Sequence, residues 1–379
     1  MRKYTLYAAT LALLFAACLT SSPVSAQTYT VLYDFPGVVG GNPFTGVIQD
    51  SAGNLYGTMR HGGAGWGTVY KIDTHNVATV LYKFRYGIKD GLHPWAGLVF
   101  DSVGNLYGTT YDGGQFNLGT VYKVTPSGKE TILHSFAGTD GSNPGNASLI
   151  LDSAGNLYGT TPGGGKAGGC GGVGCGVVFK LSPVGKMTVL HRFQGPDGRS
   201  PNAALLRDSA GNLYGTTAFG GKSSSCGLGC GEVFKLSPSG KEVILHNFTP
   251  AEGGGGVSAP LIQDSAGNFY GTTSNAVFKL DTSGNLKILH TFPFGSSYGG
   301  VVADSAGNLF GVSSNDGAFS SGLIYEIDAT GRETDLYSLD GRGDGRYPWS
   351  SLLLDSAGNL YGTTYKGGAA YGALFRFHP

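Results

Sequence analysis

Charged residues are scarce in this chain: they make up 13% of its 379 residues, and 25 Lys and Arg balance 25 Asp and Glu. No run of basic residues is present that would release counterions from a phosphate backbone, which excludes a nucleic-acid partner. A convincing amphipathic helix is also missing. The 67 glycines and 16 prolines lack a Gly-X-Y period, and 40% of the residues are apolar, so both collagen and a disordered chain are excluded.

Residues 1–26 have the pattern of a signal peptide. A basic R-K pair follows Met1, residues 6–19 form an apolar run that is short for a membrane span, and V-S-A precedes residue 27 as a cleavage site. We therefore expect export from a bacterial cytoplasm, a mature chain of one domain at residues 27–379, and no transmembrane segment after cleavage. The string F-A-A-C partly matches a lipoprotein box, which leaves lipidation of Cys18 as an alternative to a secreted, periplasmic or surface protein.

One sequence unit recurs along the mature chain. The string D-S-A-G-N-L-Y-G-T-T, or a close variant, occurs seven times at spacings of 40 to 56 residues, which is the length of a propeller blade rather than of a helical repeat. The copies begin at Asp50, Asp101, Asp152, Asp208, Asp264, Asp304 and Asp355.

Each unit contains four short β-segments, which we name strands a to d in chain order. Turn residues separate them: D-S-V-G lies between a and b in the second copy, and P-S-G lies between c and d. This alternation predicts an antiparallel meander. In the second copy the predicted strands are Trp95–Phe100, Asn105–Thr110, Thr120–Val124 and Glu130–Phe136.

The ends of the chain complete each other. The seventh copy lacks a strand d, whereas Tyr29–Phe35 resembles strand d of the second copy and precedes the first unit. We therefore predict an all-β fold, a seven-bladed β-propeller with four antiparallel strands per blade, in which the N-terminal strand closes the last blade. Such closure removes the exposed strand edges of an open array.

Together with the segments G-T-V-Y-K and I-L-H-S-F, this unit resembles the GloVer-type tandem repeats of exported bacterial proteins, the choice-of-anchor tandem-repeat group. The resemblance covers nearly all of the mature chain. It implies a secreted or surface location and carries no activity.

The meander places the b–c and d–a loops of all blades at one end of the ring, which we call the loop face. These loops vary in sequence and length, and variable loops on a rigid scaffold commonly carry binding residues. Trp95 and Trp349 begin strand a at equivalent positions, where Asn202 and Ser258 stand in other copies. Aromatic faces beside hydroxyl and amide groups suit a sugar. The predicted ligand-binding residues are Trp66, Trp95, Trp349, Phe44, Arg60, His61, His93 and Tyr111. Tyr347 and Tyr365 extend this predicted surface.

Packing between blades is the alternative interpretation of these aromatic rings. A structural role is also expected for the histidines of strand d, because Tyr stands at the same position in the other copies and a repeated residue is better explained by a contact common to all blades. The four histidines are His134, His191, His246 and His290. We predict no catalytic residue, no metal ligand and no cofactor.

Four cysteines of the mature chain lie in the two longest b–c loops. We expect one disulfide per loop, Cys170 with Cys175 and Cys226 with Cys230, because each insertion brings its own pair. Pairing between blades and a four-thiolate zinc site are the alternatives.

The function expected from the sequence is that of a secreted, monomeric, non-catalytic propeller that binds a glycan or surface polymer through its loop face. Two alternatives stay open. One is a lyase or hydrolase acting on a polysaccharide or lactone through Arg60, His61, His93 and Asp112. The other is a structural module that binds an envelope protein.

Overall fold

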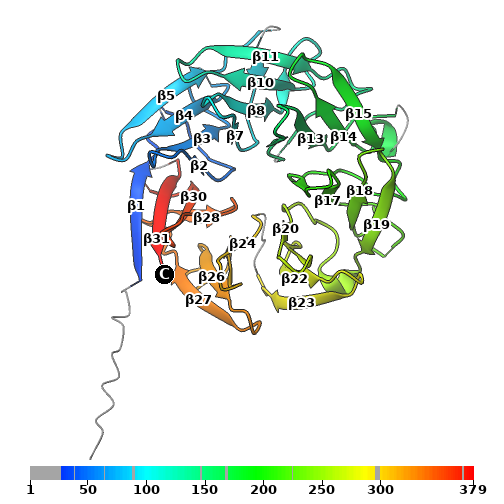
Figure 1. The fold of residues 1–379 in the computed structure, drawn as a ribbon. Coiled ribbons are helices and arrows are strands. Elements are labelled where there is room, and N and C mark those ends of the chain that lie inside the picture. Colours follow the sequence, from blue (N-terminus) through cyan, green and yellow to red (C-terminus); the bar gives the residue numbers. More distant parts are fainter. Residues whose placement is uncertain are drawn as a thin grey trace, which may run out of the picture.

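The computed structural model describes residues 27–379 except 38, 64, 88–89, 146, 167–169, 224, 295–298 and 369–370. The predicted signal peptide at residues 1–26, including Cys18, lies outside the described residues. The chain runs once around a central axis as a ring of small twisted sheets (Figure 1). None of the helices in the described part of the chain is long and apolar enough to cross a membrane.

Seven antiparallel sheets form the blades, which confirms the predicted seven-bladed propeller. Each has four blade strands, and the sheet of the seventh blade has one further strand from its d–a loop. In each blade the strands follow the order a, b, c, d from the axis outward. Blades one to three contain β2 (Ile48–Gln49), β3 (Leu55–Met59), β4 (Thr68–Ile72) and β5 (Ala78–Lys83); β7 (Val99–Phe100), β8 (Leu106–Thr110), β10 (Thr120–Val124) and β11 (Glu130–Ser135); and β12 (Ile150–Leu151), β13 (Leu157–Thr161), β14 (Val177–Leu181) and β15 (Met187–Arg192). Blades four to six contain β16 (Leu206–Arg207), β17 (Leu213–Thr217), β18 (Glu232–Leu236) and β19 (Glu242–Asn247); β20 (Ile262–Gln263), β21 (Phe269–Thr272), β22 (Ala276–Leu280) and β23 (Leu286–Thr291); and β24 (Val302–Ala303), β25 (Leu309–Ser313), β26 (Leu323–Ile327) and β27 (Glu333–Ser338).

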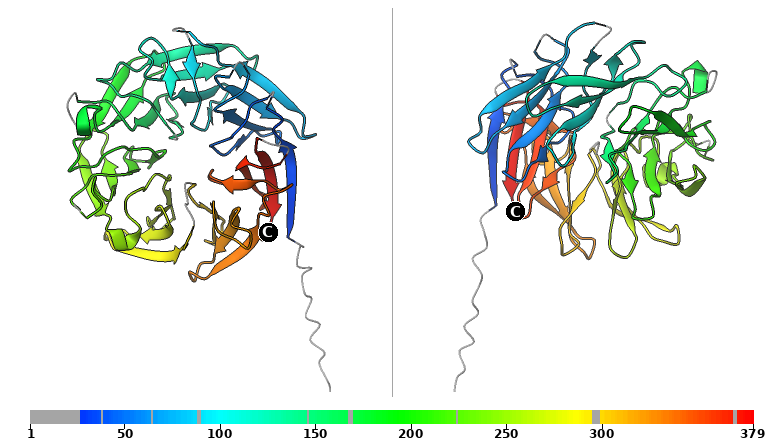
Figure 2. Two further views of the ribbon diagram at one scale, coloured as in Figure 1. Left: turned by 180° about the vertical axis from the view of Figure 1, so that it is seen from behind. Right: turned by 45° about the horizontal axis from the view of Figure 1, so that its top comes forward.

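The seventh blade joins the two ends of the described chain. Its strands are β29 (Leu353–Leu354), β30 (Leu360–Lys366), β31 (Ala373–His378) and β1 (Thr28–Asp34). Strand β1 pairs antiparallel with β31, from Thr28 opposite His378 to Asp34 opposite Ala373. Figures 1 and 2 show the two strands side by side from all three directions. The predicted closure by the N-terminal strand is therefore confirmed.

The innermost strands are shorter than predicted. Strand a of the second blade was expected over Trp95–Phe100, but only its last two residues, Val99–Phe100, form a strand. The blades converge near the axis: a Cβ atom added to Gly97 would lie 2.5 Å from the Ser148 hydroxyl of the next blade. The chain before Val99 therefore contacts the neighbouring blade and does not extend the strand hydrogen bonds of its own sheet.

The repeated L-Y-G string makes room for an aromatic ring. A Cβ atom on Gly215 of strand b would lie 2.6 Å from the ring of Phe234 on strand c, and the corresponding glycines of the other blades face Tyr or Phe in the same way. The ring of Phe234 also packs edge-on against Phe193, which directly follows strand d of the preceding blade, at 5.3 Å. Both rings are almost fully buried. This pair connects neighbouring blades, so the repeat encodes packing between blades as well as within them.

The repeated D-S-A-G-N string builds the turn between strands a and b. In the first blade the carboxylate of Asp50 accepts hydrogen bonds from the backbone N–H groups of Ala52 and Asn54, from the Asn54 amide at 2.8 Å and from the Tyr56 hydroxyl at 3.0 Å. Burial alone would raise the pKa of Asp50, but these hydrogen bonds outweigh it and the pKa is lowered. The turn therefore uses the first, third, fifth and seventh residues of the string.

The histidines of strand d bond to the following d–a loop. His134 Nε2 lies 2.7 Å from the Asp140 carboxylate, and the Tyr82 hydroxyl, at the equivalent position of blade one, donates to Asp90 at 2.8 Å. The same contact recurs in His191–Asp197, His246–Glu252 and Tyr337–Asp344. The hydrogen bond predicted from the repeated position is thus present in five blades, at Tyr82, His134, His191, His246 and Tyr337.

Candidate functional site

The d–a and b–c loops meet at one end of the ring, as predicted. In the second blade β6 (Gly91–Leu92) of the d–a loop pairs with β9 (Asp112–Gly113) of the b–c loop. In the seventh blade β28 (Arg346–Pro348) pairs likewise with β30. These pairings hold the d–a and b–c loops of blades two and seven together on the loop face.

A backbone bond links each of five d–a loops to the b–c loop of the preceding blade. The residue that donates stands just before a proline and has a positive φ, which few residues other than Gly and Asn adopt without strain. Asn occupies the position at Asn42 and Asn143, but the second and seventh blades place the larger His93 (φ 55°) and Tyr347 (φ 59°) there. Strain thus accompanies bulky side chains beside the predicted aromatic site. The five donors are Asn42, His93, Asn143, Ser200 and Tyr347.

A cavity of about 440 Å³ lies at the axis of the ring. Its lining combines apolar groups with the hydroxyls of Thr45, Ser148, Ser258, Ser350 and Ser351, and its described lining residues include no charged side chain. Phe44 and Trp349 also line the cavity. The axis therefore offers hydrogen-bonding groups without a charge.

Five aromatic rings of blades seven, one and two gather where the cavity meets the loop face; we call them the aromatic sector. Phe44 is central, with ring centroids 4.9 Å from Tyr365, 5.2 Å from Trp349 and 5.5 Å from Trp95. Trp349 stacks on Tyr365 at 4.1 Å, and Trp95 lies 4.4 Å from Tyr111. All five are half-buried. The rings thus pack on one another, as the alternative interpretation held, and still expose part of their surface.

Arg60 occupies in blade one the position of Tyr111 and Tyr365 in their blades, directly after strand b. Its guanidinium carbon lies 4.0 Å from the Trp95 ring centroid, a cation–π distance. Arg60 Nε and Trp95 Nε1 are both buried and have no hydrogen-bond partner among the described residues. Two buried donors therefore stand beside the rings, where an acceptor on a ligand would satisfy them.

A second group of rings lies further out on blades one and two. Trp66 lies 5.5 Å from His93 and 5.2 Å from the exposed Tyr86, and His61 contacts His93 edge-on at 5.7 Å. Burial, followed by the charges of Arg60 and His93, lowers the pKa of His61. His61 is therefore mostly neutral at neutral pH.

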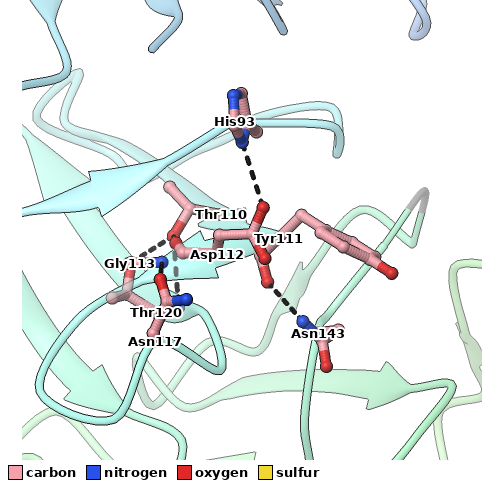
Figure 3. Close-up of polar contacts among 8 residues, drawn as sticks. All are labelled: His93, Thr110, Tyr111, Asp112, Gly113, Asn117, Thr120 and Asn143. Carbon is pink, nitrogen blue, oxygen red and sulfur yellow. Dashed lines mark hydrogen bonds and ion pairs between the residues drawn. The ribbon is translucent and has the colours of Figure 1, made fainter. Parts of the chain in front are cut away.

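Figure 3 shows how His93 is held. Its Nδ1 lies 3.0 Å from the Asp112 carboxylate, and the ring of Tyr111 extends away from this pair. The b–c loop that carries Asp112 is fixed from both sides, because the Thr110 hydroxyl donates to the Asp112 carbonyl at 2.9 Å and the Asn143 amide donates to the Tyr111 carbonyl at 3.1 Å. His93 and Asp112 thus form an ordered imidazole–carboxylate pair.

The structure brings all eight predicted ligand-binding residues to one side of the loop face. Tyr365, which the sequence indicated as an extension of the surface, contacts Phe44 and Trp349. Tyr86 was not predicted, although its ring contacts Trp66. It lies in a d–a loop, and no repeated position in the sequence indicated it.

Two disulfides close the long b–c loops of blades three and four, as predicted. Cys170 pairs with Cys175, and Cys226 pairs with Cys230. Cys175 and Cys230 are fully buried. We call these two loops the disulfide sector.

Comparison with known proteins identifies the family. The chain belongs to the Gloeobacter/Verrucomicrobia repeat family, whose model matches residues 19–173, 167–293 and 274–379, and this confirms the resemblance seen in the repeats. No curated protein matches the sequence.

Solved structures of other propellers share the fold. The chain is similar to a streptogramin B lyase (10% identity, 93% of this chain and 97% of that chain, TM-score 0.61) and to virginiamycin B lyase from Staphylococcus aureus (12%, 93% and 99%, TM-score 0.62). It is also similar to the extracellular domain of a hybrid two-component system from B. thetaiotaomicron (14%, 94% and 41%, TM-score 0.59). At these identities the likeness extends to the fold alone.

Proposed function

We propose that this protein is exported through residues 1–26 and binds an extracellular glycan or surface polymer at the aromatic sector without catalysing a reaction. One observation carries the proposal: half-buried, mutually packed rings stand at the end of a cavity whose described lining is rich in hydroxyls and uncharged. Sugar rings present apolar faces and hydroxyl edges, and this arrangement offers a surface for each.

In this proposal the aromatic rings contact the apolar faces of the sugar, and the buried N–H groups bind its oxygen atoms. The exposed faces of Trp95 and Trp349 stack on pyranose rings, while Trp66 extends the surface outward over blade one. Arg60 Nε and Trp95 Nε1 donate to hydroxyl, ether or carboxylate oxygens of the ligand. Because the rings already pack on one another, little side-chain entropy is lost on binding.

The test is a glycan array with the mature protein, followed by calorimetry with the oligosaccharide that binds best. We expect Trp95→Ala and Trp349→Ala each to weaken binding about tenfold, which corresponds to the roughly 1.4 kcal/mol of one stacked ring. Asn202→Ala, at the equivalent position of the fourth blade, serves as the matched control and leaves affinity within about twofold. Binding that survives the triple Trp66, Trp95 and Trp349 replacement would show that the ligand sits elsewhere.

A second candidate function, a polysaccharide or lactone lyase or hydrolase, is favoured by the His93–Asp112 pair. A carboxylate on Nδ1 orients the imidazole and leaves Nε2 to exchange a proton with a substrate, with Arg60 close by to bind a negative group. Turnover of a bound oligosaccharide, lost in His93→Ala with binding retained, supports this function over binding alone. Retention of ligand without any product over long incubation contradicts it.

Export is tested separately. The two disulfides fit an oxidising compartment. We expect the native host to process the chain at Ala26 and to release it from the cytoplasm, with fractionation and N-terminal sequencing as the measurement. A mature chain that begins at a lipidated Cys18 would contradict cleavage at Ala26.

A further inference from the structure

A cluster of potential metal ligands lies at the junction of blades three and four, away from the aromatic sector. His191 is the penultimate residue of strand β15, Asp197 lies in the following d–a loop, and Glu242 begins β19 of the next blade. His191 Nε2 is 3.1 Å from the Asp197 carboxylate and 3.6 Å from that of Glu242. One donor atom from each of the three residues lies within 4.8 Å of the others. Figure 1 shows β15 beside β18 and β19.

A third acidic side chain is buried beside this cluster. Glu232, the first residue of β18, is fully buried, and neither of its carboxylate oxygens has a hydrogen-bond partner in the part of the chain that the structure describes. The carboxylate lies between two loop glycines: Cβ atoms on Gly198, next to Asp197, and on Gly221 would lie 2.8 and 3.3 Å from its oxygens. Buried, unpaired carboxylates are strongly unfavourable unless a proton or a cation neutralises them.

The other blades supply internal comparisons. At the second blade, Glu130 occupies the position of Glu242, but its titratable neighbours are Tyr82 and Asp90. Thr120 stands there at the position of Glu232. Among the described residues, this junction is the only one with a histidine, a loop carboxylate and an acid at both strand positions. Elsewhere the position of Glu232 holds Thr68, Thr120, Val177, Ala276, Leu323 and Ala373.

The repeats also show that this chemistry is not needed for the fold. The remaining blades form the same four-stranded sheets and pack in the same way with apolar residues or threonine at the position of Glu232. The strand pairing therefore does not require acids at Glu232 and Glu242. A cation that neutralises the two carboxylates would explain why both are present at this junction.

We propose that the junction of blades three and four binds one divalent transition-metal ion, of the Zn²⁺ class, through His191, Asp197 and Glu242, with Glu232 supplying further negative charge. One imidazole nitrogen and two carboxylates form a donor set that Zn²⁺ accepts, whereas Ca²⁺ is held by oxygens alone. Sequence reasoning predicted no metal ligand because these residues come from two blades and lack any regular spacing. The site joins β15 to β19 and so ties two blades together at their outer edge.

The proposal is tested by calorimetric titration of the full mature protein with Zn²⁺ after treatment with a chelator. We expect one ion per chain, protons released on binding, and a higher melting temperature with Zn²⁺. Glu242→Gln and His191→Gln each weaken binding by about tenfold or more, since each removes one ligand. Glu232→Gln weakens it to a smaller extent.

Glu130→Gln is the matched control, because it makes the same change at the equivalent position of the second blade. It leaves Zn²⁺ affinity unchanged. Circular dichroism of each metal-free variant shows whether it folds. Absence of Zn²⁺ binding by the folded protein, or binding that Glu242→Gln and His191→Gln leave intact, overturns the proposal, and so does stabilisation of the metal-free protein by Glu232→Gln with no uptake of metal by the parent. None of these outcomes bears on the glycan proposal.

Discussion

The loop face has two sides that order their loops differently. On the aromatic sector the b–c loop of blade two is held by hydrogen bonds and its rings pack on one another while part of each ring stays exposed. On the disulfide sector the longer loops are closed by Cys170–Cys175 and Cys226–Cys230, and one sulfur of each pair is fully buried. The same scaffold positions thus carry a surface for contact on one side and a covalent support on the other. Ordered but half-exposed side chains, rather than loop length, are the feature on which the proposed binding surface rests.

The largest effect separating the two sides is expected from the disulfides. Replacing both cysteines of a pair with serine frees a small loop in the unfolded chain, which costs about 2 kcal/mol of unfolding free energy for each pair by the loop-closure model. Urea denaturation of the single-pair and double-pair variants measures it. The aromatic sector lies on other blades, so ligand binding there stays unchanged. Equal stability of the parent and the double-pair variant would show that the loops are already free before the blades unfold.

An intermediate effect is expected when the aromatic side is given the residue of the opposite side. Trp95→Asn introduces the side chain found at Asn202 and removes the contacts with Tyr111 and Arg60. Because the ring is only half-buried, we expect a loss of about 1–2 kcal/mol of unfolding free energy. The matched control Asn202→Ala changes stability by less than about 0.5 kcal/mol. A loss of about 4 kcal/mol in Trp95→Asn would mark the ring as core rather than surface.

The smallest effect concerns pH and the junction of blades one and two. Burial, followed by the charge of Asp90, raises the pKa of Glu130 from its ordinary 4.5 to about 7. The unfolded chain releases this proton at lower pH than the folded chain, so the stability that the protonated form contributes is present below about pH 4.5 and is lost as pH rises through about 7. Thermal melts from pH 4.5 to 8 should show a decline that is smaller by about 2 °C in Glu130→Gln. An identical decline in parent and variant would exclude Glu130 as its source.

Much of the architecture followed from the sequence because the fold is repeated. Each D-S-A-G-N-L-Y-G string specifies a turn, a glycine under an aromatic ring and a strand. Seven copies of such a unit predict a ring of similar blades. The short innermost strands did not follow, since the convergence of Gly97 on Ser148 depends on how close the blades approach the axis. The register predicted the aromatic sector, but not that its rings would be half-exposed. The acidic cluster that contains Glu232 and Glu242 was not predicted, because its contacts are made between two blades.

The pairing of β1 with β31 also sets an order of events during synthesis. β1 leaves the ribosome first, but its hydrogen-bonding partner is made only after six blades have emerged. Until then its edge is open, and closure across so long a stretch of chain is slow compared with the formation of a single blade. If the chain is exported as proposed, this delay helps its passage through a membrane channel, because a ring that cannot close early keeps the chain open.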